Sequence, residues 1–166
     1  MAAETFDPAQ LSSAKAERYA ELALEIASVL HGEPSFTARL ATVAAMLAQS
    51  FPHFFWTGFY LVDPASPDEL VVGPYQGTLG CLRIAFGRGV CGTAAAERRT
   101  VIVPDVDAFP GHIACDSRSK SEIVVPVFGP GGALLGVLDV DASELAAFDE
   151  GDAAGLERIL RATFGT

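Results

Sequence analysis

The chain has 166 residues, of which 50% are hydrophobic and 19% are charged, and its formal net charge is −10 at pH 7. Such a composition is typical of a soluble globular domain that buries about two thirds of its unfolded surface. The acidic excess argues against nucleic acid or an anionic membrane as a partner. Because no run of about eighteen apolar residues occurs and the N-terminus lacks the pattern of a secretory signal, we expect a cytoplasmic protein.

Three cysteines occur in the chain: Cys81, Cys91 and Cys115. Since no export signal is recognised, we expect them to begin as reduced thiols. An odd number of cysteines in this setting favours reactive or metal-binding thiols over structural disulfides. The segments around the thiols are therefore the first candidates for chemistry.

Two helices are predicted at the start of the chain. Residues 11–30 carry apolar side chains at helical spacing, and Gly32 provides a stop. Ser35 is placed to cap a second helix over 36–49. The residues expected on the buried stripe of the first helix are Tyr19, Leu22, Ile26, Val29 and Leu30. Those expected on the buried face of the second are Leu40, Val43 and Leu47.

Strands are predicted after the helix pair. Residues 54–62 are rich in aromatic and β-branched side chains, and the alternation of a strand puts Trp56 and Tyr60 on one face. Residues 69–75 and 79–86 are expected to form a hairpin around the glycine-containing turn between them. The first cysteine of the chain would then lie in the second strand of this hairpin.

The middle of the chain is predicted to be irregular. A short helix over 90–98 carries Cys91 in its first turn, where the helix dipole favours an anion. Residues 101–103 form a short strand, and residues 105–121 form a long loop that holds Cys115. These two cysteines are therefore expected in connecting segments.

The last part of the sequence predicts a second hairpin and a helix. Residues 122–128 and 133–141 are two apolar strands about a proline- and glycine-rich turn, and Asp149 is placed to cap a final helix. Hairpin-connected strands between terminal helices indicate an α+β fold. We expect a central antiparallel sheet with the N- and C-terminal helices on one face and a ligand pocket on the other.

The segment GHIACDSRSKSE, residues 111–122, places Cys115 in a polar loop just before an apolar strand. A cysteine with a packing role usually lies inside the apolar run instead. His112, Arg118 and Lys120 are close in sequence, and positive charge favours the reactive thiolate. Considered alone, Cys115 could equally be a loop cysteine without a chemical role. Three thiols in three glycine-bearing segments together favour a redox site.

Acidic residues interrupt the apolar strand LLGVLDVD, where Asp139 and Asp141 share one face. Two carboxylates that project from one face repel each other, so at least one should have a raised pKa or a cationic partner. Glu122 opens the neighbouring strand and is expected to reach the same pocket. Acids beside the aromatic side chains of Trp56 and Tyr60 suit a ligand with an ammonium group and a short apolar arm.

The motifs WTGFYL, LVVGPYQG, RIAFGRGVCGTAAA, GHIACDSRSKSEIVVPV and GVLDVD lie between Phe54 and Asp141. Together they resemble the free methionine-R-sulfoxide reductases, a family built on a GAF domain. The combination of GHIACDSxSxSE with RGVCG is highly specific to that family. The resemblance implies one GAF domain over 1–166, with helices in 1–50, the sheet and catalytic loops in 54–141, and a C-terminal helix in 149–162.

The resemblance also implies an activity. Members reduce the R epimer of free methionine sulfoxide without a metal or organic cofactor, take electrons from thioredoxin, and are commonly homodimers. By resemblance, Cys115 attacks the sulfoxide, Cys81 resolves the sulfenic acid to a disulfide, and Cys91 binds substrate or substitutes as the resolving thiol. Thioredoxin then reduces the disulfide.

Ligand binding is assigned by the same resemblance to Trp56, Tyr60, Glu122, Asp139 and Asp141. Attack on a sulfoxide requires a proton for the departing oxygen. A carboxyl group kept partly protonated by its neighbours can supply it, and Asp141 or Glu122 is our hypothesis for that group.

Three other functions compete with this interpretation. The first is a non-catalytic GAF sensor that binds a small molecule, although a sensor needs no trio of thiols. The second is a metal site built from Cys81, Cys91, His112 and Cys115, although no CxxC pair supports it. The third is a peroxide-sensing thiol protein, which would react with hydrogen peroxide but would not turn over a sulfoxide.

Overall fold

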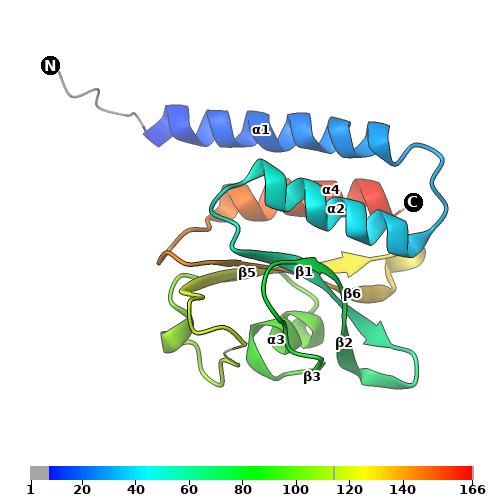
Figure 1. The fold of residues 1–166 in the computed structure, drawn as a ribbon, viewed down its shortest axis with the longest axis vertical. Helices are drawn as coiled ribbons and strands as arrows, with labels where there is room; N and C mark the ends of the chain where they lie inside the picture. Colours follow the sequence, from blue (N-terminus) through cyan, green and yellow to red (C-terminus); the bar gives the residue numbers. More distant parts are fainter. Residues whose placement is uncertain (1–7, 114, 166) are drawn as a thin grey trace, which may run out of the picture.

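The computed structural model describes residues 8–113 and 115–165. Helices α1, α2 and α4 lie on one side of a sheet, and the short helix α3 lies with long loops on the other side (Figure 1). The helices are α1 (Pro8–Val29), α2 (Phe36–Ser50), α3 (Gly89–Glu97) and α4 (Glu150–Phe164). The strands are β1 (Trp56–Asp63), β2 (Ser66–Gln76), β3 (Arg83–Ala85), β4 (Val101–Val103), β5 (Ser121–Phe128) and β6 (Leu134–Ala142).

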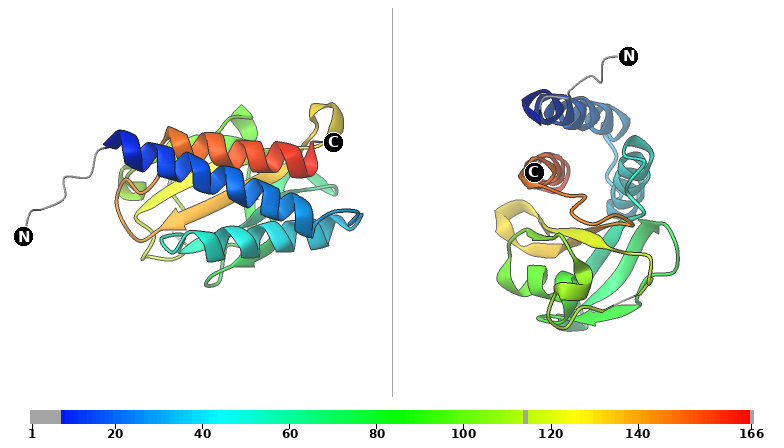
Figure 2. Two further views of the ribbon diagram at one scale, coloured as in Figure 1. Left: turned by 90° about the horizontal axis from the view of Figure 1, so that it is seen from above. Right: turned by 90° about the vertical axis from the view of Figure 1, so that its left-hand side faces the viewer.

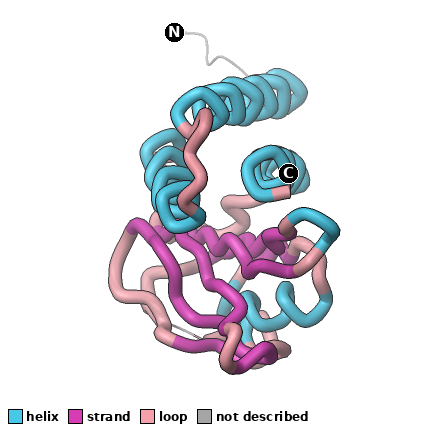
Figure 3. The backbone as a smooth tube through the Cα atoms, turned by 90° about the vertical axis from the view of Figure 1, so that its right-hand side faces the viewer, coloured by secondary structure: helices cyan, strands magenta, loops and turns pink. Residues whose placement is uncertain are grey.

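In the described residues the strands form one sheet in the order β3-β2-β1-β6-β5-β4, and each neighbouring pair is antiparallel. End-on views show the strands curling beneath the helix layer, with α1 outermost (Figures 2 and 3). The predicted α+β fold, with its antiparallel sheet and terminal helices on one face, is confirmed. No helix in the described residues is long and apolar enough to cross a membrane.

Apolar side chains divide into two cores, one on each face of the sheet. On β1, the alternation of the strand sends Phe59 into the core beneath the helices and Tyr60 into the core on the opposite side. On β6, Leu138 and Val137 separate in the same way. The sheet is therefore buried on both faces, and the core away from the long helices surrounds the candidate site.

Helix α1 differs from prediction at its C-terminal end. Tyr19, Leu22 and Ile26 are buried as expected, but Val29 is 62% exposed. Helix α1 ends at Val29, and Leu30, in the turn that follows, is buried as expected. The buried residues expected on α2 are confirmed.

The predicted hairpin over 69–75 and 79–86 is only partly correct. Strand β2 begins earlier, at Ser66, and pairs with β1, while β3 contains just Arg83–Ala85. The intervening segment 77–82 is a loop that packs against Trp56, whose indole Nε1 donates to the Thr78 carbonyl over 2.9 Å. A Cβ atom on Gly77 would lie 2.7 Å from the indole ring, so the loop can approach this closely only because that position is glycine.

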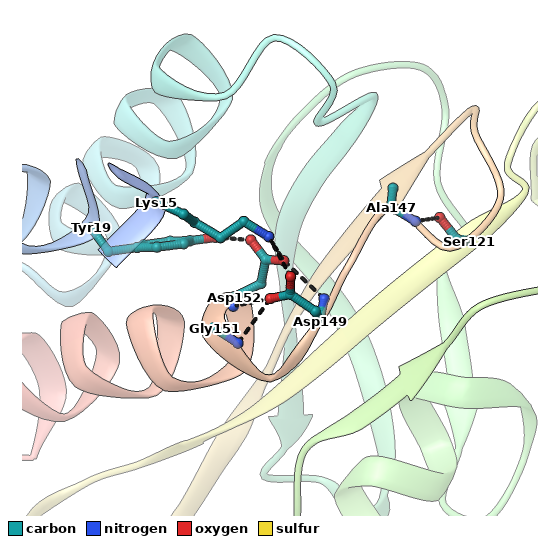
Figure 4. A network of polar contacts seen from close by, with 7 residues as sticks. All are labelled: Lys15, Tyr19, Ser121, Ala147, Asp149, Gly151 and Asp152. Atoms are coloured by element: carbon teal, nitrogen blue, oxygen red, sulfur yellow. Dashed lines mark hydrogen bonds and ion pairs between the residues drawn. The ribbon is translucent and has the colours of Figure 1, made fainter. Parts of the chain in front are cut away.

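Capping follows the sequence signals. The Ser35 hydroxyl accepts a hydrogen bond from the Ala38 amide, and Asp149 forms a capping box with Asp152 at the start of α4. Figure 4 shows that Lys15 and Tyr19 reach from α1 to this end of α4. The Tyr19 hydroxyl donates to Asp152 over 2.9 Å, and Lys15 pairs with both aspartates at 2.8 Å.

The loop before α4 is attached to the first residue of β5. The Ser121 hydroxyl donates to the Glu144 carbonyl over 2.6 Å. It also accepts from the Ala147 amide over 3.2 Å, a contact drawn in Figure 4. Glu122, a candidate site residue, directly follows Ser121. These contacts therefore fix the start of β5, which carries Glu122, against the loop before α4.

Candidate active site

A pocket opens on the face of the sheet away from the long helices. Its volume is about 550 Å³, including the part open to solvent. Strands β1, β5 and β6 form its floor, α3 forms a wall, and loops 77–82 and 111–119 lie at the mouth. A concave site lined by aromatic side chains and a few polar groups suits a small molecule. Every candidate site residue from the sequence except Cys81 lines it.

Strand register brings three carboxyl groups together. Asp141 pairs with Glu122 across β5 and β6, and it pairs with Trp56 across β1 and β6. Asp139 lies two residues before Asp141 on the same strand face, opposite Gly58. Glu122 and Asp139 are buried, so the floor of the pocket concentrates carboxyl groups in a place that water reaches poorly.

Burial changes the acidity of these groups. Desolvation raises the pKa of Glu122 and of Asp139 well above the ordinary carboxyl range, and the nearby charge of Asp141 adds to both effects. Desolvation also raises the pKa of Asp141, to about 6, against the opposing effects of a hydrogen bond from Ser119 and the charge of His112. His112 Nε2 lies 3.6 Å from a Glu122 oxygen. These three carboxyl groups therefore keep their protons at a higher pH than ordinary carboxyl groups do.

One oxygen of Asp139 has unfilled bonding capacity. Its Oδ1 atom is buried and has no hydrogen-bond partner among the described residues. An unpaired buried polar atom is costly, and in a pocket floor it indicates a place for a hydrogen-bond donor from a ligand. An ammonium group would supply that donor and would offset the carboxylate charge.

Cys91 lies in the first turn of α3 as predicted, but its environment reverses the expected effect on its acidity. The thiol is buried, with Sγ 3.9 Å from Glu122 Oε1. Desolvation raises its pKa well above the usual thiol range, and the charges of Asp139, Glu122 and Asp141 raise it further. The helix dipole is outweighed because the acidic cluster faces the sulfur directly, so Cys91 is held as a neutral thiol.

Cys81 and Cys115 form a disulfide, with their Cα atoms 5.7 Å apart. This bond joins loop 77–82 to loop 111–119 at the mouth of the pocket. While this bond is present, its two sulfurs are not available as thiolate ligands for the zinc site that combined them with Cys91 and His112.

The described residues do contain another set of atoms with metal-binding spacing. The ligand atoms of Cys91, Glu122 and Asp139 all lie within 4.8 Å of one another. The raised pKa values of all three groups mean that a metal would have to displace their protons on binding. An ammonium group can instead donate a hydrogen bond to the unpaired oxygen of Asp139.

The same two loops are joined by a second contact. The Thr78 hydroxyl donates to Asp116 Oδ2 over 2.8 Å. Asp116 directly follows Cys115, and Thr78 lies in the same loop as Cys81. Arg118 pairs with Asp116 at 2.8 Å and lies 4.7 Å from the centre of the Phe55 ring. Arg118 is therefore engaged with these partners, although the sequence had suggested it as a charge neighbour of Cys115.

An aromatic stack forms the side of the pocket. The Trp56 ring stacks on Tyr60, with centroids 5.7 Å apart, and on Tyr75, with centroids 5.0 Å apart. Gly80 closes over this stack, since a Cβ there would lie 2.9 Å from the indole. The expected shared face of Trp56 and Tyr60 is present, and Tyr75 was not anticipated.

Two polar residues of the site were missed by sequence reasoning. Arg88 precedes α3 and lines the pocket, so the lining contains a guanidinium group as well as the acids. Ser119 is buried and donates to Asp141. The arginine between two glycines in Gly87–Gly89 was a usable signal for the first, whereas nothing local distinguished Ser119 from neighbouring loop serines.

Comparison with known proteins identifies the family. Residues 38–162 match the GAF domain family. A free methionine-R-sulfoxide reductase from Escherichia coli is 42% identical, with 88% of this chain and 86% of that protein covered. A free methionine-R-sulfoxide reductase from Saccharomyces cerevisiae is 38% identical, with 89% of this chain and 84% of that protein covered.

A solved structure gives the same result at the level of the fold. The free methionine-R-sulfoxide reductase from Neisseria meningitidis, described in complex with its substrate, is 49% identical and superimposes with a TM-score of 0.85. The match covers 98% of this chain and 92% of that one. The chain therefore belongs to the free methionine-R-sulfoxide reductase family of GAF domain proteins.

Proposed function

We propose that the protein reduces free L-methionine (R)-S-oxide to L-methionine. The observation that carries this proposal is the Cys81–Cys115 disulfide at the mouth of a pocket with an acidic floor. A redox-active pair of thiols beside a site for an ammonium-bearing ligand fits reduction of a free amino acid. The relatives that bear the name of this activity support the same assignment.

The pocket has a complementary group for each part of the substrate. The ammonium group binds at Asp139, Asp141 and Glu122, where it fills the unpaired Asp139 oxygen. The carboxylate faces Arg88, and the methylene arm lies along the Trp56 stack. A methionine residue within a peptide has no free ammonium group, so it loses the first of these interactions.

Reduction begins with the reduced enzyme. The Cys115 thiolate attacks the sulfoxide sulfur, the oxygen is transferred to Cys115 as a sulfenic acid, and methionine is released. A proton must reach the sulfoxide oxygen during this step. Glu122 and Asp141 hold protons near neutral pH because burial raises their pKa values, which makes them the candidate acids.

The cycle closes through the second thiol. The Cys81 thiol attacks the Cys115 sulfenic acid, which releases water and forms the disulfide that the structure contains. Thioredoxin then reduces the disulfide to two thiols and is itself oxidised. Cys91, neutral and 3.9 Å from Glu122, contributes a thiol hydrogen bond within the acidic cluster rather than a thiolate.

The decisive experiment is a thioredoxin-coupled assay with separate substrates: the R epimer of free methionine sulfoxide, the S epimer, and a peptide-bound form. We expect turnover of the free R epimer alone. Cys115→Ser should abolish turnover, and Cys81→Ser should permit one turnover and then stall at the sulfenic acid. Absence of turnover with the free R epimer and fully reduced protein would refute the proposal and leave the sensor or peroxide-sensing alternatives.

The role of the acids is tested by single-turnover measurement of sulfenic acid formation. Glu122→Gln and Asp141→Asn each remove a proton donor while keeping nearly the same shape. We expect a loss of about 10²–10⁴-fold in the variant that lacks the true general acid. Unchanged rates in both variants would contradict this part of the mechanism.

We also propose that the reaction needs no metal or organic cofactor. Protein dialysed against a strong chelator should keep its full activity with the free R epimer, and metal analysis should find less than one equivalent bound. Activity that disappears on chelation and returns with one added divalent metal would overturn this proposal and point to the cluster of Cys91, Glu122 and Asp139.

A further inference from the structure

Exposed apolar side chains surround the disulfide. Leu79 is 77% exposed and Leu82 is 69% exposed, and these two residues flank Cys81 in its loop. Ile113, two residues before Cys115, is 38% exposed. We refer to Leu79, Leu82 and Ile113 as the apolar collar.

The loop that carries Leu79 and Leu82 is held in place by hydrogen bonds that do not involve these two exposed side chains. Loop 77–82 is held by main-chain contacts: the Leu82 carbonyl accepts from the Val72 amide over 3.0 Å, and the Thr78 carbonyl accepts from the Trp56 side chain. The Leu82 side chain does not line the pocket, so it does not contact a ligand there. Leu79 and Ile113 line the edge of the pocket, yet both keep a large exposed fraction. Large apolar groups left exposed around a redox bond indicate a surface that another protein covers.

The chemistry of the disulfide specifies the kind of partner. A bond that forms in every catalytic cycle must be reduced in every cycle, by a thiolate that reaches one of its two sulfurs. Cys115 is exposed, whereas Cys81 is half-buried. A protein reductant therefore has to place its own thiol over Cys115, and its surface around that thiol would then lie on the collar.

We propose that the apolar collar is the docking surface for a dithiol reductant of the thioredoxin type, an inference that rests on the proposed function. The reductant's thiolate attacks Cys115 Sγ, a mixed disulfide forms, and Cys81 leaves as a thiolate that takes up a proton. The reductant's second thiol, as its thiolate, then attacks the first sulfur of the reductant and releases Cys115. The protein gains two electrons, and the reductant becomes a disulfide.

The small size of the collar agrees with a transient complex. Redox encounters have interfaces at the low end of the size range, below about 1,200 Å² in total. In such interfaces a few anchoring side chains dominate the affinity. Loss of one collar leucine should therefore slow reduction by the protein reductant measurably without blocking it.

The test measures reduction of the oxidised protein directly, without methionine sulfoxide. Pre-oxidised protein is mixed with reduced thioredoxin, and loss of the disulfide is followed through the fluorescence of Trp56, the single tryptophan, which packs on loop 77–82. Leu82→Gln should lower the second-order rate constant about three- to tenfold, and the double variant with Leu79→Gln should lower it further. Leu145→Gln is the matched control, since Leu145 is 61% exposed but lies outside the collar.

Dithiothreitol serves as a reductant too small to use the collar. We expect Leu82→Gln to react with dithiothreitol at the wild-type rate, so that only the thioredoxin reaction slows. The proposed docking surface would be refuted if the double variant reacted with thioredoxin at the wild-type rate. It would also be refuted if the rate constants for thioredoxin and dithiothreitol fell by the same factor. Because this assay contains no methionine sulfoxide, such a result is independent of whether the proposed activity is correct.

A trapping experiment tests which sulfur is attacked. Thioredoxin with its second thiol replaced by serine should form a stable mixed disulfide with the oxidised protein. Mass spectrometry of the digested adduct should find the link at Cys115. A link predominantly at Cys81 would contradict the proposed direction of approach.

Discussion

Asp139 shows how a single residue of this protein is placed at a cost to the fold. Its carboxyl group is buried beside Glu122 and Asp141, and one of its oxygens lacks a hydrogen-bond partner among the described residues. Desolvation raises its pKa because the ligand-free pocket solvates the ionised form poorly. A ligand ammonium group would supply the missing hydrogen bond and stabilise the ionised form, which makes the same feature useful for binding.

The pH dependence of ligand binding follows from Asp141, whose pKa burial raises to about 6. An ammonium group binds the ionised carboxylate, so a protonated Asp141 must release its proton on binding. Of the two candidate acids, Glu122 is then the one that keeps its proton in the complex, because its pKa is raised well above the ordinary range. Affinity of the reduced protein for L-methionine should therefore rise as pH increases from 5 to 7, by about tenfold from this residue, and level off above. Calorimetry in two buffers with different ionisation enthalpies measures both the affinity and the protons released.

Asp141→Asn is the control for this prediction. The amide cannot titrate, so the variant should bind more weakly and should lose the step near pH 6. Affinity that falls as pH rises through this range would show that binding requires the protonated pocket instead.

At the scale of elements, the two loops that carry the redox cysteines are held together twice. One link is the disulfide, and the other is the hydrogen bond from Thr78 to Asp116. Only the second link persists when the thiols are reduced. It therefore helps to keep Cys81 near Cys115 until the Cys81 thiol attacks the Cys115 sulfenic acid.

Thr78→Val removes the hydroxyl while keeping the side-chain shape and the main-chain bond to Trp56. The effective concentration of Cys81 at Cys115, measured by equilibrium with glutathione, should fall about three- to tenfold because the loops separate more readily. Thr100→Val is a matched control because the Thr100 hydroxyl also donates to a carboxylate, that of Glu157. Thr100 lies outside both cysteine loops and outside the pocket. An equal effect of both variants would mean that the Thr78 contact has no special role.

Helix α1 depends on a polar attachment to α4 (Figure 4). The Tyr19 hydroxyl donates to Asp152, which is fully buried. Tyr19→Phe keeps the aromatic packing against Phe51 but removes this donor, and should lower the free energy of unfolding in urea by about 1–3 kcal/mol. Ser13→Ala removes an exposed hydrogen bond to Glu17 on the same helix and should change stability little. Similar losses in the two variants would contradict the importance of the buried contact.

At the scale of the whole molecule, the sheet separates two tasks. One face is covered by the helix layer, and the other carries the site between α3 and the loops (Figure 1). The helix layer still exposes the apolar side chains of Leu24 and Val29 on α1. This is the surface on which we expect the homodimer implied by the family resemblance.

Light scattering after size-exclusion chromatography tests that expectation. The protein should elute with the mass of two chains, and Leu24→Glu should shift it to the mass of one, because a charge buried in an interface is costly. Leu145→Glu, which places a charge on an exposed loop residue outside the helix layer, should leave the mass unchanged. A wild-type protein with the mass of one chain at micromolar concentration would contradict the prediction.

The sequence by itself determined the features that depend on local periodicity and local chemistry. Alternation along β1 sends Phe59 and Tyr60 to opposite faces, and the side chains of Ser35 and Asp149 cap the helices that follow them. Alternation along LLGVLDVD likewise predicted that Asp139 and Asp141 share a face. Each of these outcomes depends on neighbours within a few residues, so no knowledge of the remaining chain was needed.

Only the tertiary structure decided the features that depend on distant partners. Loop 77–82 leaves the predicted strand because it packs on Trp56, and Val29 is exposed because α1 ends at that residue. Cys91 is a neutral thiol because burial and, after it, the acids of two other strands raise its pKa, although its place in a helix first turn favoured an anion. Burial and electrostatic fields are set by residues far apart in the chain, and so they arise only when the sheet and α3 come together.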